Sequence, residues 1–398
     1  MTVVQIELPA YKVVTTTDPA LPYVLVDERE IQVVVVADYL RELTASDCSP
    51  LTVKSYAFDL QGWFRFLLAE GVAWDAATRV QVRDYVLMLR SAENPQRRRA
   101  TPNYQVPGPH PRTGKPRRGG GYAPATINHR LAVLSSFYEF AKRIGVGPEV
   151  IPVPGAGAGN RSLRHRSPLE PRTPTRRGSY RQKTGALVPR AIPDELYEEV
   201  FGSLTSDRDR AIVALLVSSG ARASELLGMT LTDVDWGGQR IRLIGKGTRA
   251  PEWVAVSPDA LLCLSRYLAG ERPRDHPDPT LWLTLRKPYR PLRYQAMRAM
   301  LLRVNARLGL DLVLHDFRHT CGIRLASDPA IPITDVRAHL RHRTLASSEP
   351  YLVARPDDVI ARVREHHHAP PTTPAPSPAV SWSYDRSDLT ALLGPALS

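Results

Sequence analysis

Five short sites in the second half of the chain carry side chains that together could act on a phosphodiester. An arginine binds phosphate as a planar fork, a histidine accepts a proton near neutral pH, and a lysine can protonate a leaving alkoxide. Tyrosine, with a reference pKa of ~10, becomes a nucleophile when a base or nearby cations assist its ionisation. The sites, in chain order, contain Arg222, Lys246, His315 with Arg318, His342 and Tyr351.

This set supplies a nucleophile, a base, an acid and an anion clamp without a metal ion. The sequence shows no Asp/Glu cluster suited to a divalent cation, so the side-chain cations would neutralise the transition state instead. His366, His367 and His368 are adjacent, cannot all face one ion on a helix, and lack a cysteine partner nearby. We therefore expect no metal and no cofactor, and a disordered tail around these histidines.

The elements around these sites predict mainly α structure with a small antiparallel β-sheet. A buried helix through Ile212 and Leu216 ends at Gly220, two residues before Arg222. His315 and Arg318 are three residues apart and share one helix face. Alternating residues 239–244 and 252–256 predict two strands around a turn that contains Lys246. Further helices are expected at about 258–269, 293–308, 316–326 and 332–340.

The first half of the chain predicts a helical domain followed by a linker. Apolar residues recur at helical spacing from Val53 to Leu68 and from Ile127 to Ala141, with a shorter pattern over about 78–90. Residues 95–122 are rich in Pro, Gly and Arg and predict a loop. The expected divisions are an N-terminal extension (1–30), a helical domain (31–146) with the basic loop (95–122), a basic Pro/Gly-rich linker (147–190), a second domain (191–365) and a tail (366–398).

The net charge of +13 is concentrated in two segments. Residues 97–118 carry +7 with no acid, and residues 161–190 carry +8, so all the other residues together carry −2. This pattern predicts a polyanionic partner that is bound at particular places. The candidate contacts are Arg97, Arg98, Arg99, Arg112, Lys115, Arg117, Arg118, Arg176 and Arg177.

Several classes of protein are disfavoured by the composition. The longest aliphatic run, Val33–Val36, is far shorter than the ~20 residues that span a bilayer. The first ten residues lack the pattern of a signal peptide, and three cysteines without CxxC spacing argue against a disulfide scaffold or a zinc ribbon. We expect a bacterial cytoplasmic protein, associated with the nucleoid when bound to DNA, and no membrane partner.

The ordered motifs resemble those of the tyrosine site-specific recombinases, or phage integrases. The resemblance rests on Gly-x-Arg-x-Ser-Glu-Leu at 220–226, the turn Lys246, His-x-x-Arg-His-Thr at 315–320, Leu-x-His at 340–342, and Tyr351 nine residues later. It covers about 35–146 as a core-binding, SAM-like DNA-binding domain and about 190–360 as a catalytic domain. The family's arrangement of these domains implies a C-shaped DNA clamp.

The resemblance implies a role for each site residue. Tyr351 would attack the scissile phosphate, leaving a 3′-phosphotyrosyl bond and a free 5′-hydroxyl, and Lys246 would protonate the leaving oxygen. His315 would assist proton transfer at the tyrosine, and Glu225 would brace the pocket. The phosphate oxygens would be held by Arg222, Arg318 and His342. Neither ATP nor metal would be required, because the bond energy is stored in the covalent intermediate.

The resemblance also implies partners: double-stranded DNA target sites, a dimer on each site, a tetramer in the synapse, and a possible accessory DNA-bending or directionality factor. The expected function is a site-specific recombinase or integrase that serves integration, excision or resolution. The amphipathic piece at 388–393 is a candidate protomer-exchange helix, because its apolar stripe has no local core to join.

Alternatives remain for the function and for single residues. A type IB topoisomerase-like enzyme would share the chemistry, and a non-catalytic DNA-binding regulator could use the same scaffold. His339 competes with His342, and a helix C-terminus could explain either histidine. Arg341 stands where the family commonly has glycine, which adds charge beside the expected phosphate position. Cys321 is expected to be a small buried apolar residue rather than a reactive thiol.

Overall fold

The computed structural model describes residues 11–95, 108–116, 119–153, 179–184, 190–245, 250–342, 364 and 368. Contacts divide the chain into two compact units, which are described separately below. The first unit contains residues 1–187 together with Asn305–Asp311, and the second contains Val188–Val304 and Leu312–Ser398.

The first unit begins with a two-stranded antiparallel hairpin, β1 (Lys12–Thr15) and β2 (Tyr23–Val26), in which Val13 pairs with Leu25. Leu25 is fully buried, and β2 contacts both α1 (Val34–Ala45) and α2 (Pro50–Ala69). Residues 11–30, to which the sequence assigned no role, therefore contribute to the same core as the helices that follow.

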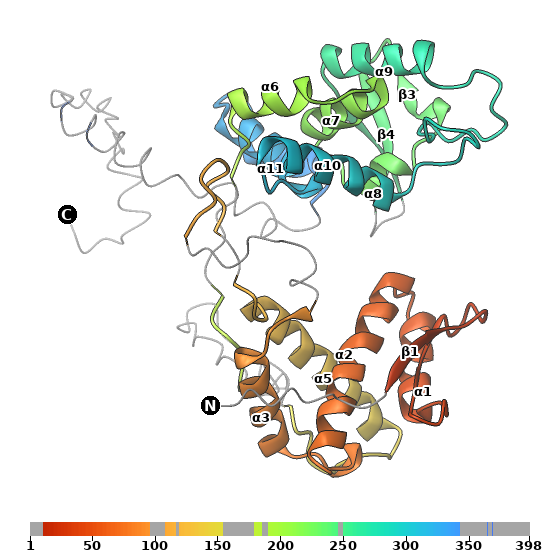
Figure 1. Ribbon diagram of the computed structural model, residues 1–398, viewed down its shortest axis with the longest axis vertical. Helices are drawn as coiled ribbons and strands as arrows, with labels where there is room; N and C mark the ends of the chain where they lie inside the picture. Colours follow the sequence, from red (N-terminus) through yellow and green to blue (C-terminus); the bar gives the residue numbers. More distant parts are fainter. Residues whose placement is uncertain are drawn as a thin grey trace, which may run out of the picture. The chain divides into compact units, whose positions relative to one another are not determined.

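Helices make up most of the first unit (Figure 1). Ser49 caps α2 by accepting a hydrogen bond from the Thr52 backbone N–H, and Pro50 occupies the first turn, where its missing N–H costs nothing. Thr78 and Gln81 form a capping box at the start of α3 (Arg79–Ser91). A short 3₁₀ turn, η1 (Trp74–Ala76), precedes α3, and α5 (Pro124–Arg143) completes the bundle.

The core of the first unit is rich in aromatic side chains. Trp63 of α2 is fully buried between Tyr85 and Tyr138, and its indole N–H donates to the Tyr138 hydroxyl at 2.9 Å. Tyr138 in turn donates to the Trp74 carbonyl at 2.9 Å. These bonds satisfy the polar ends of rings that otherwise contribute apolar area.

Parts of the expected basic loop and linker pack onto this unit. Arg112 and Lys115 donate to the carbonyl oxygens of Leu308 and Asp311. Val153 is 3% exposed, and Gln182 exchanges two hydrogen bonds with the side chain of Asn128 on α5. The described pieces of these segments are therefore attached to folded structure.

The second unit is built around α7 (Asp207–Ser219), in which every residue from Ala211 to Val217 is buried. Helix α7 packs against α9 (Pro258–Gly270) and α11 (Leu314–Ser327), as Figure 1 shows. It is preceded by α6 (Asp194–Gly202) and followed by the short α8 (Ala223–Leu227). An apolar helix without a polar face is typical of a domain centre.

A three-stranded antiparallel sheet lies beside α8. It contains β3 (Val234–Asp235), β4 (Arg240–Ile244) and β5 (Pro251–Ala255), with β4 in the middle, and follows the 3₁₀ turn η3 (Leu231–Asp233). Ile241 and Leu243 of β4 are fully buried, so one face of the sheet joins the core. The predicted strand–turn–strand unit is confirmed, while its turn, residues 246–249, lies outside the described residues.

Helix α10 (Tyr294–Leu308) as far as Val304, together with α11 and α12 (Ile333–His339), completes the described part of the second unit. Leu340, directly after α12, is fully buried and packs with Cys321 of α11 and Val336 of α12. The predicted fold class is confirmed: the chain is mainly helical with small antiparallel sheets. No described helix is long and apolar enough to cross a membrane.

Candidate active site

The site begins at a tight turn between α7 and α8. Gly220 caps α7 in the left-handed conformation, with φ of 59°, where a Cβ atom would strain the backbone. A Cβ there would also lie 2.5 Å from Leu340 Cδ2 and 3.2 Å from the sulfur of Cys321. Glycine is therefore required by conformation and by space, and the turn delivers Arg222 to the start of α8.

Glu225 holds Arg222 in two ways. Its Oε1 accepts from Nη1 of Arg222 at 2.6 Å, and its Oε2 accepts from the Arg222 backbone N–H at 2.9 Å. The Glu225 side chain is 1% exposed, whereas that of Arg222 is 36% exposed. Burial alone would raise the pKa of Glu225, but the Arg222 backbone bond and the charges of Arg341 and Arg222 outweigh it and lower that pKa. Arg222 is thus a preorganised cation that still faces solvent.

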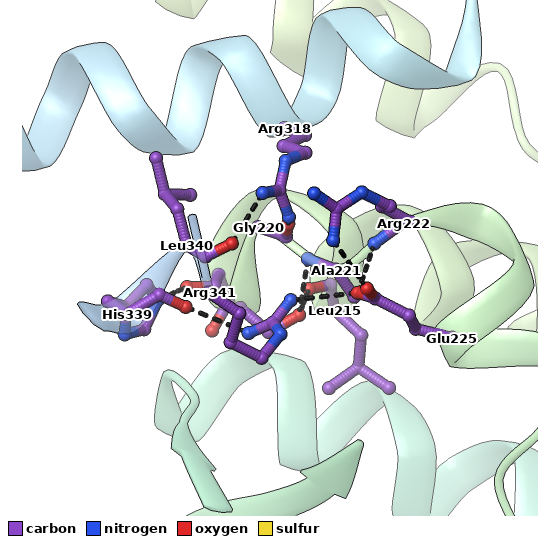
Figure 2. A network of polar contacts seen from close by, with 11 residues as sticks. Leu215, Gly220, Ala221, Arg222, Glu225, Arg318, His339, Leu340 and Arg341 are labelled. Atoms are coloured by element: carbon purple, nitrogen blue, oxygen red, sulfur yellow. Dashed lines mark hydrogen bonds and ion pairs between the residues drawn. The ribbon is translucent and has the colours of Figure 1, made fainter. Parts of the chain in front are cut away.

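Arg318 of α11 lies in the interior, 1% exposed. Its two terminal nitrogens donate to the carbonyl oxygens of Gly220 and Leu340, as Figure 2 shows. These carbonyls belong to the turn that carries Arg222 and to the turn that carries His342. Arg318 therefore connects the two turns through hydrogen bonds to their backbone carbonyls, and it places a positive charge beside both turns.

The charges of Arg318 and Arg222 affect the pKa of both His315 and His342. Burial, followed by the charge of Arg318, lowers the pKa of each histidine, with a further lowering from Arg222. The pKa of His342 falls to about 4, and His315 contributes to that shift. His315 keeps an exposed surface although protein atoms surround much of its ring. Both imidazoles are therefore neutral at pH 7, and each is a weaker base than a free histidine.

His339, the competitor of His342, has a different environment. Its Nε2 lies 3.2 Å from the carbonyl oxygen of Ser218, so the ring is engaged with the end of α7. Burial lowers its pKa, partly opposed by that hydrogen bond. Of the two histidines, His342 is the one on which the charges of both Arg318 and Arg222 act. This difference favours His342 as the phosphate-facing histidine.

Several predicted residues lie outside the described residues. They include the candidate nucleophile and acid, Tyr351 and Lys246, and most of the candidate DNA contacts: Arg97, Arg98, Arg99, Arg117, Arg118, Arg176 and Arg177. Arg112 and Lys115 are described, and both bond to carbonyl oxygens of the first unit. Among the site residues, the structure therefore brings together Arg222, Glu225, His315, Arg318 and His342.

Neighbouring residues of the site do not offer a metal centre or a reactive thiol. Within the described ranges, no group of three or more His, Cys, Asp or Glu side chains is arranged to hold a metal ion. Cys321 is 2% exposed, and burial raises the pKa of its thiol to about 12. This agrees with the expectation of a small buried apolar residue.

One residue of the network was not among the predicted site residues. Arg341 donates to Oε2 of Glu225 at 2.9 Å and to the carbonyl oxygen of His339 at 2.8 Å. The sequence did mark this position as a departure from the family's usual glycine. What it could not show is that the side chain turns inward to a carboxylate 116 residues earlier in the chain.

The chain is similar to a known protein family and to several known proteins. Residues 194–356 match the model of the phage integrase family. The chain is 26% identical to a tyrosine recombinase XerC of Myxococcus xanthus over 318 residues, covering 76% of this chain and 87% of that relative. It is 30% identical over 156 residues to the integrase/recombinase y4gC of Sinorhizobium fredii, covering 39% of this chain and 80% of that relative.

Solved structures share the fold. XerH recombinase bound to a palindromic difH substrate aligns with a TM-score of 0.55 at 15% identity, over 81% of this chain and 82% of that one. A lambda integrase dimer bound to a COC′ core site aligns with a TM-score of 0.53 at 13% identity, over 80% and 94% of the two chains. Both of these solved relatives are DNA complexes.

The family match and the recombinase relatives identify a DNA strand-transfer enzyme. The chain belongs to the phage integrase family, the tyrosine site-specific recombinases. It is accordingly an enzyme of DNA breakage and rejoining, and family membership favours recombinase over the topoisomerase-like and non-catalytic alternatives.

Proposed function

We propose that Tyr351 is the nucleophile of a metal-independent and ATP-independent strand transfer that serves integration, excision or resolution. Its hydroxyl oxygen attacks the scissile phosphorus, and the bond from phosphorus to the 5′-oxygen breaks. The products are a 3′-phosphotyrosyl ester and a 5′-hydroxyl, which takes its proton from Lys246. Attack by the 5′-hydroxyl of another strand reverses these steps and restores the tyrosine. The number of phosphodiester bonds is therefore conserved.

The observation that carries this proposal is the convergence of Arg222, Arg318, His315 and His342. Burial, followed by the charges of Arg318 and Arg222, lowers the pKa of both imidazoles, so the histidines stay neutral in a site whose arginines are cationic. In this arrangement Arg222, Arg318 and His342 hold the phosphate oxygens, and His315 receives the tyrosine proton. Preorganised cations of this kind stabilise the charge that develops in a phosphoryl-transfer transition state.

The test uses a DNA substrate that the protein itself selects. A binding site is recovered from a random duplex library, and a duplex that carries it is nicked so that the cleaved strand end diffuses away. The wild-type protein should form a covalent protein–DNA adduct in chelator and without ATP, whereas Tyr351→Phe should bind the same duplex and form none. An adduct that persists in Tyr351→Phe would place the nucleophile elsewhere, and an adduct that needs metal would reject the mechanism.

The DNA-binding proposal assigns the helical first unit to the core-binding domain and the second unit to catalysis. The basic segments 97–118 and 161–190 would contact the phosphate backbone. Because each neutralised phosphate contributes a slope of about −0.9 to the dependence of log K on log salt, replacing Arg97, Arg98 and Arg99 with Gln should flatten that dependence. An unchanged slope would mean that these three arginines do not contact DNA phosphates.

The proposed assembly is a dimer on each DNA site and a tetramer in the synapse, with residues 388–393 exchanged between protomers. Deleting 381–398 should weaken tetramer formation on DNA while the monomer still folds. Tetramer formation at the full-length level after this deletion would count against the exchange.

A further inference from the structure

Arg341 lies inside the site but has no part in the proposed mechanism. Its side chain is 3% exposed, so its guanidinium faces protein rather than solvent. Figure 2 shows it extending from the turn after Leu340 towards the carboxylate of Glu225. The bonds to Glu225 Oε2 and to the carbonyl oxygen of His339 occupy one donor on each terminal nitrogen.

Placing an arginine here has two physical costs that glycine would avoid. The backbone of Arg341 has φ of 54°, in the left-handed region where a side chain with a Cβ atom is disfavoured. Its guanidinium is also withdrawn from water, and Nε has no hydrogen-bond partner in the described structure. A buried ion pair contributes little net stability once desolvation is counted. Strain of this kind is characteristic of sites where geometry is functional.

The hydrogen bonds of Glu225 show that its carboxylate fixes the orientation of Arg222. One of its oxygens accepts from the side chain of Arg222. The other accepts from the Arg222 backbone and from Arg341 together. Without Arg341, the carboxylate would keep its bonds to Arg222 but lose the contact that anchors it to the turn before His342. The orientation of the Arg222 fork would then depend on the α8 turn alone.

We propose that Arg341 is a positioning residue, which sets the orientation of Arg222 through the shared carboxylate of Glu225. This inference rests on the proposed function, in which Arg222 holds the scissile phosphate. Arg318 also joins the two turns, but in this network it bonds their backbone carbonyls. Arg341 is the residue that connects the His342 turn to the side chain that fixes the Arg222 guanidinium.

The experiment separates cleavage from DNA binding. Arg341→Met, Arg341→Gly and Arg341→Lys are compared with wild type on the nicked duplex described above, using the full chain at saturating protein. We expect Arg341→Met and Arg341→Gly to slow adduct formation about 10- to 100-fold, with the DNA dissociation constant within about threefold of wild type. Arg341→Lys restores a charge that can reach Glu225 and should recover part of the rate.

The variants also control for folding. Arg341→Gly relieves the backbone strain while removing the side chain, so it should fold even where Arg341→Met does not. Arg210→Met removes a different ion pair of the same unit, with Asp207 on α7, and should leave the adduct rate unchanged. A rate loss in Arg210→Met equal to that in Arg341→Met would mean that general destabilisation, not positioning, explains the effect.

A double variant tests the route through the carboxylate. If Arg341 acts through Glu225, the pair Arg341→Met with Glu225→Gln should be no slower than Glu225→Gln alone. Multiplying losses would overturn the inference, as would a wild-type rate in Arg341→Met. Neither result affects the proposed function, which fails separately if the wild-type protein forms no Tyr351-dependent adduct.

Discussion

The interiors of the two units bury different kinds of side chain. The first unit surrounds Trp63 with aromatic rings: Tyr138 bonds to the Trp63 indole and to backbone, and Tyr85 accepts from Arg130, which also pairs with buried Asp59. The second unit places its buried charges directly in its site, where the whole residues Arg318 and Glu225 are 1% and 4% exposed. An aromatic core stabilises by area and packing, whereas buried charges are expensive unless each one is paired.

This difference suggests that the interior of the first unit mainly determines stability, whereas the interior of the second unit mainly determines the reaction. Arg318 and Glu225 lie between the α7–α8 turn and the turn after α12, where the proposed mechanism places the phosphate. In the same proposal the first unit presents a stable surface to DNA. Substitutions in the first interior should therefore change the free energy of unfolding, and substitutions in the second should change the rate of cleavage.

The largest effect is expected from Trp63→Ala. Removing a fully buried indole leaves a cavity and takes away the hydrogen bond that the Tyr138 hydroxyl accepts, which should lower the free energy of unfolding by about 3–5 kcal/mol. Chemical denaturation measures the change, and Leu68→Ala on the same helix, at a position 42% exposed, is the control. Equal losses in the two variants would contradict the aromatic core as the main source of stability.

Arg222→Ala should have its main effect on the reaction. The side chain is 36% exposed, so little packing is lost, but the fixed cation disappears from the site. We expect cleavage to slow about 100- to 1,000-fold, or about 2.7–4 kcal/mol of transition-state stabilisation. Single-turnover adduct formation gives the rate, and thermal unfolding gives the stability. A variant that unfolds early while cleaving normally when folded would reverse the comparison.

Gly220→Ala should affect both quantities, because the turn belongs to the core and to the site. The added Cβ atom meets Leu340, and the left-handed backbone disfavours alanine, so we expect a loss of about 1–3 kcal/mol in stability together with slower cleavage. The matched control is Gly202→Ala at the end of α6, where a Cβ atom has no neighbour within 4 Å. Tolerance of alanine at both glycines would show that the turn adapts freely.

The smallest effect is expected from pH. The pKa of His342 is about 4 in the folded chain, because burial and the charges of Arg318, Arg222, Arg341 and His315 disfavour its protonated form. An unfolded histidine titrates at ~6.5. Between these values the unfolded state binds more protons, so the free energy of unfolding should fall as pH falls from 6.5 to 4. Urea denaturation at pH 7 and pH 5 should show a smaller drop in His342→Gln than in wild type.

Much of the local structure could be predicted because its causes are local. Helical stripes, the Gly220 stop and the alternating strands around residue 246 each depend on neighbouring residues. The packing of residues 11–30 against α1 and α2 could not be predicted in this way. It depends on a hairpin that meets helices later in the chain.

The sequence by itself determined the order of elements and the two basic segments, and it supplied the set of side chains proposed to transfer a phosphoryl group. Only the tertiary structure decided how those side chains differ. It buries Arg318 but leaves Arg222 partly exposed to solvent. The ring of His339 contacts the Ser218 carbonyl, whereas the charges of Arg318 and Arg222 both lower the pKa of His342. The side chain of Arg341 bonds to Glu225. The physical reason is that burial and charge depend on which distant segments pack together, and spacing along the chain does not specify that.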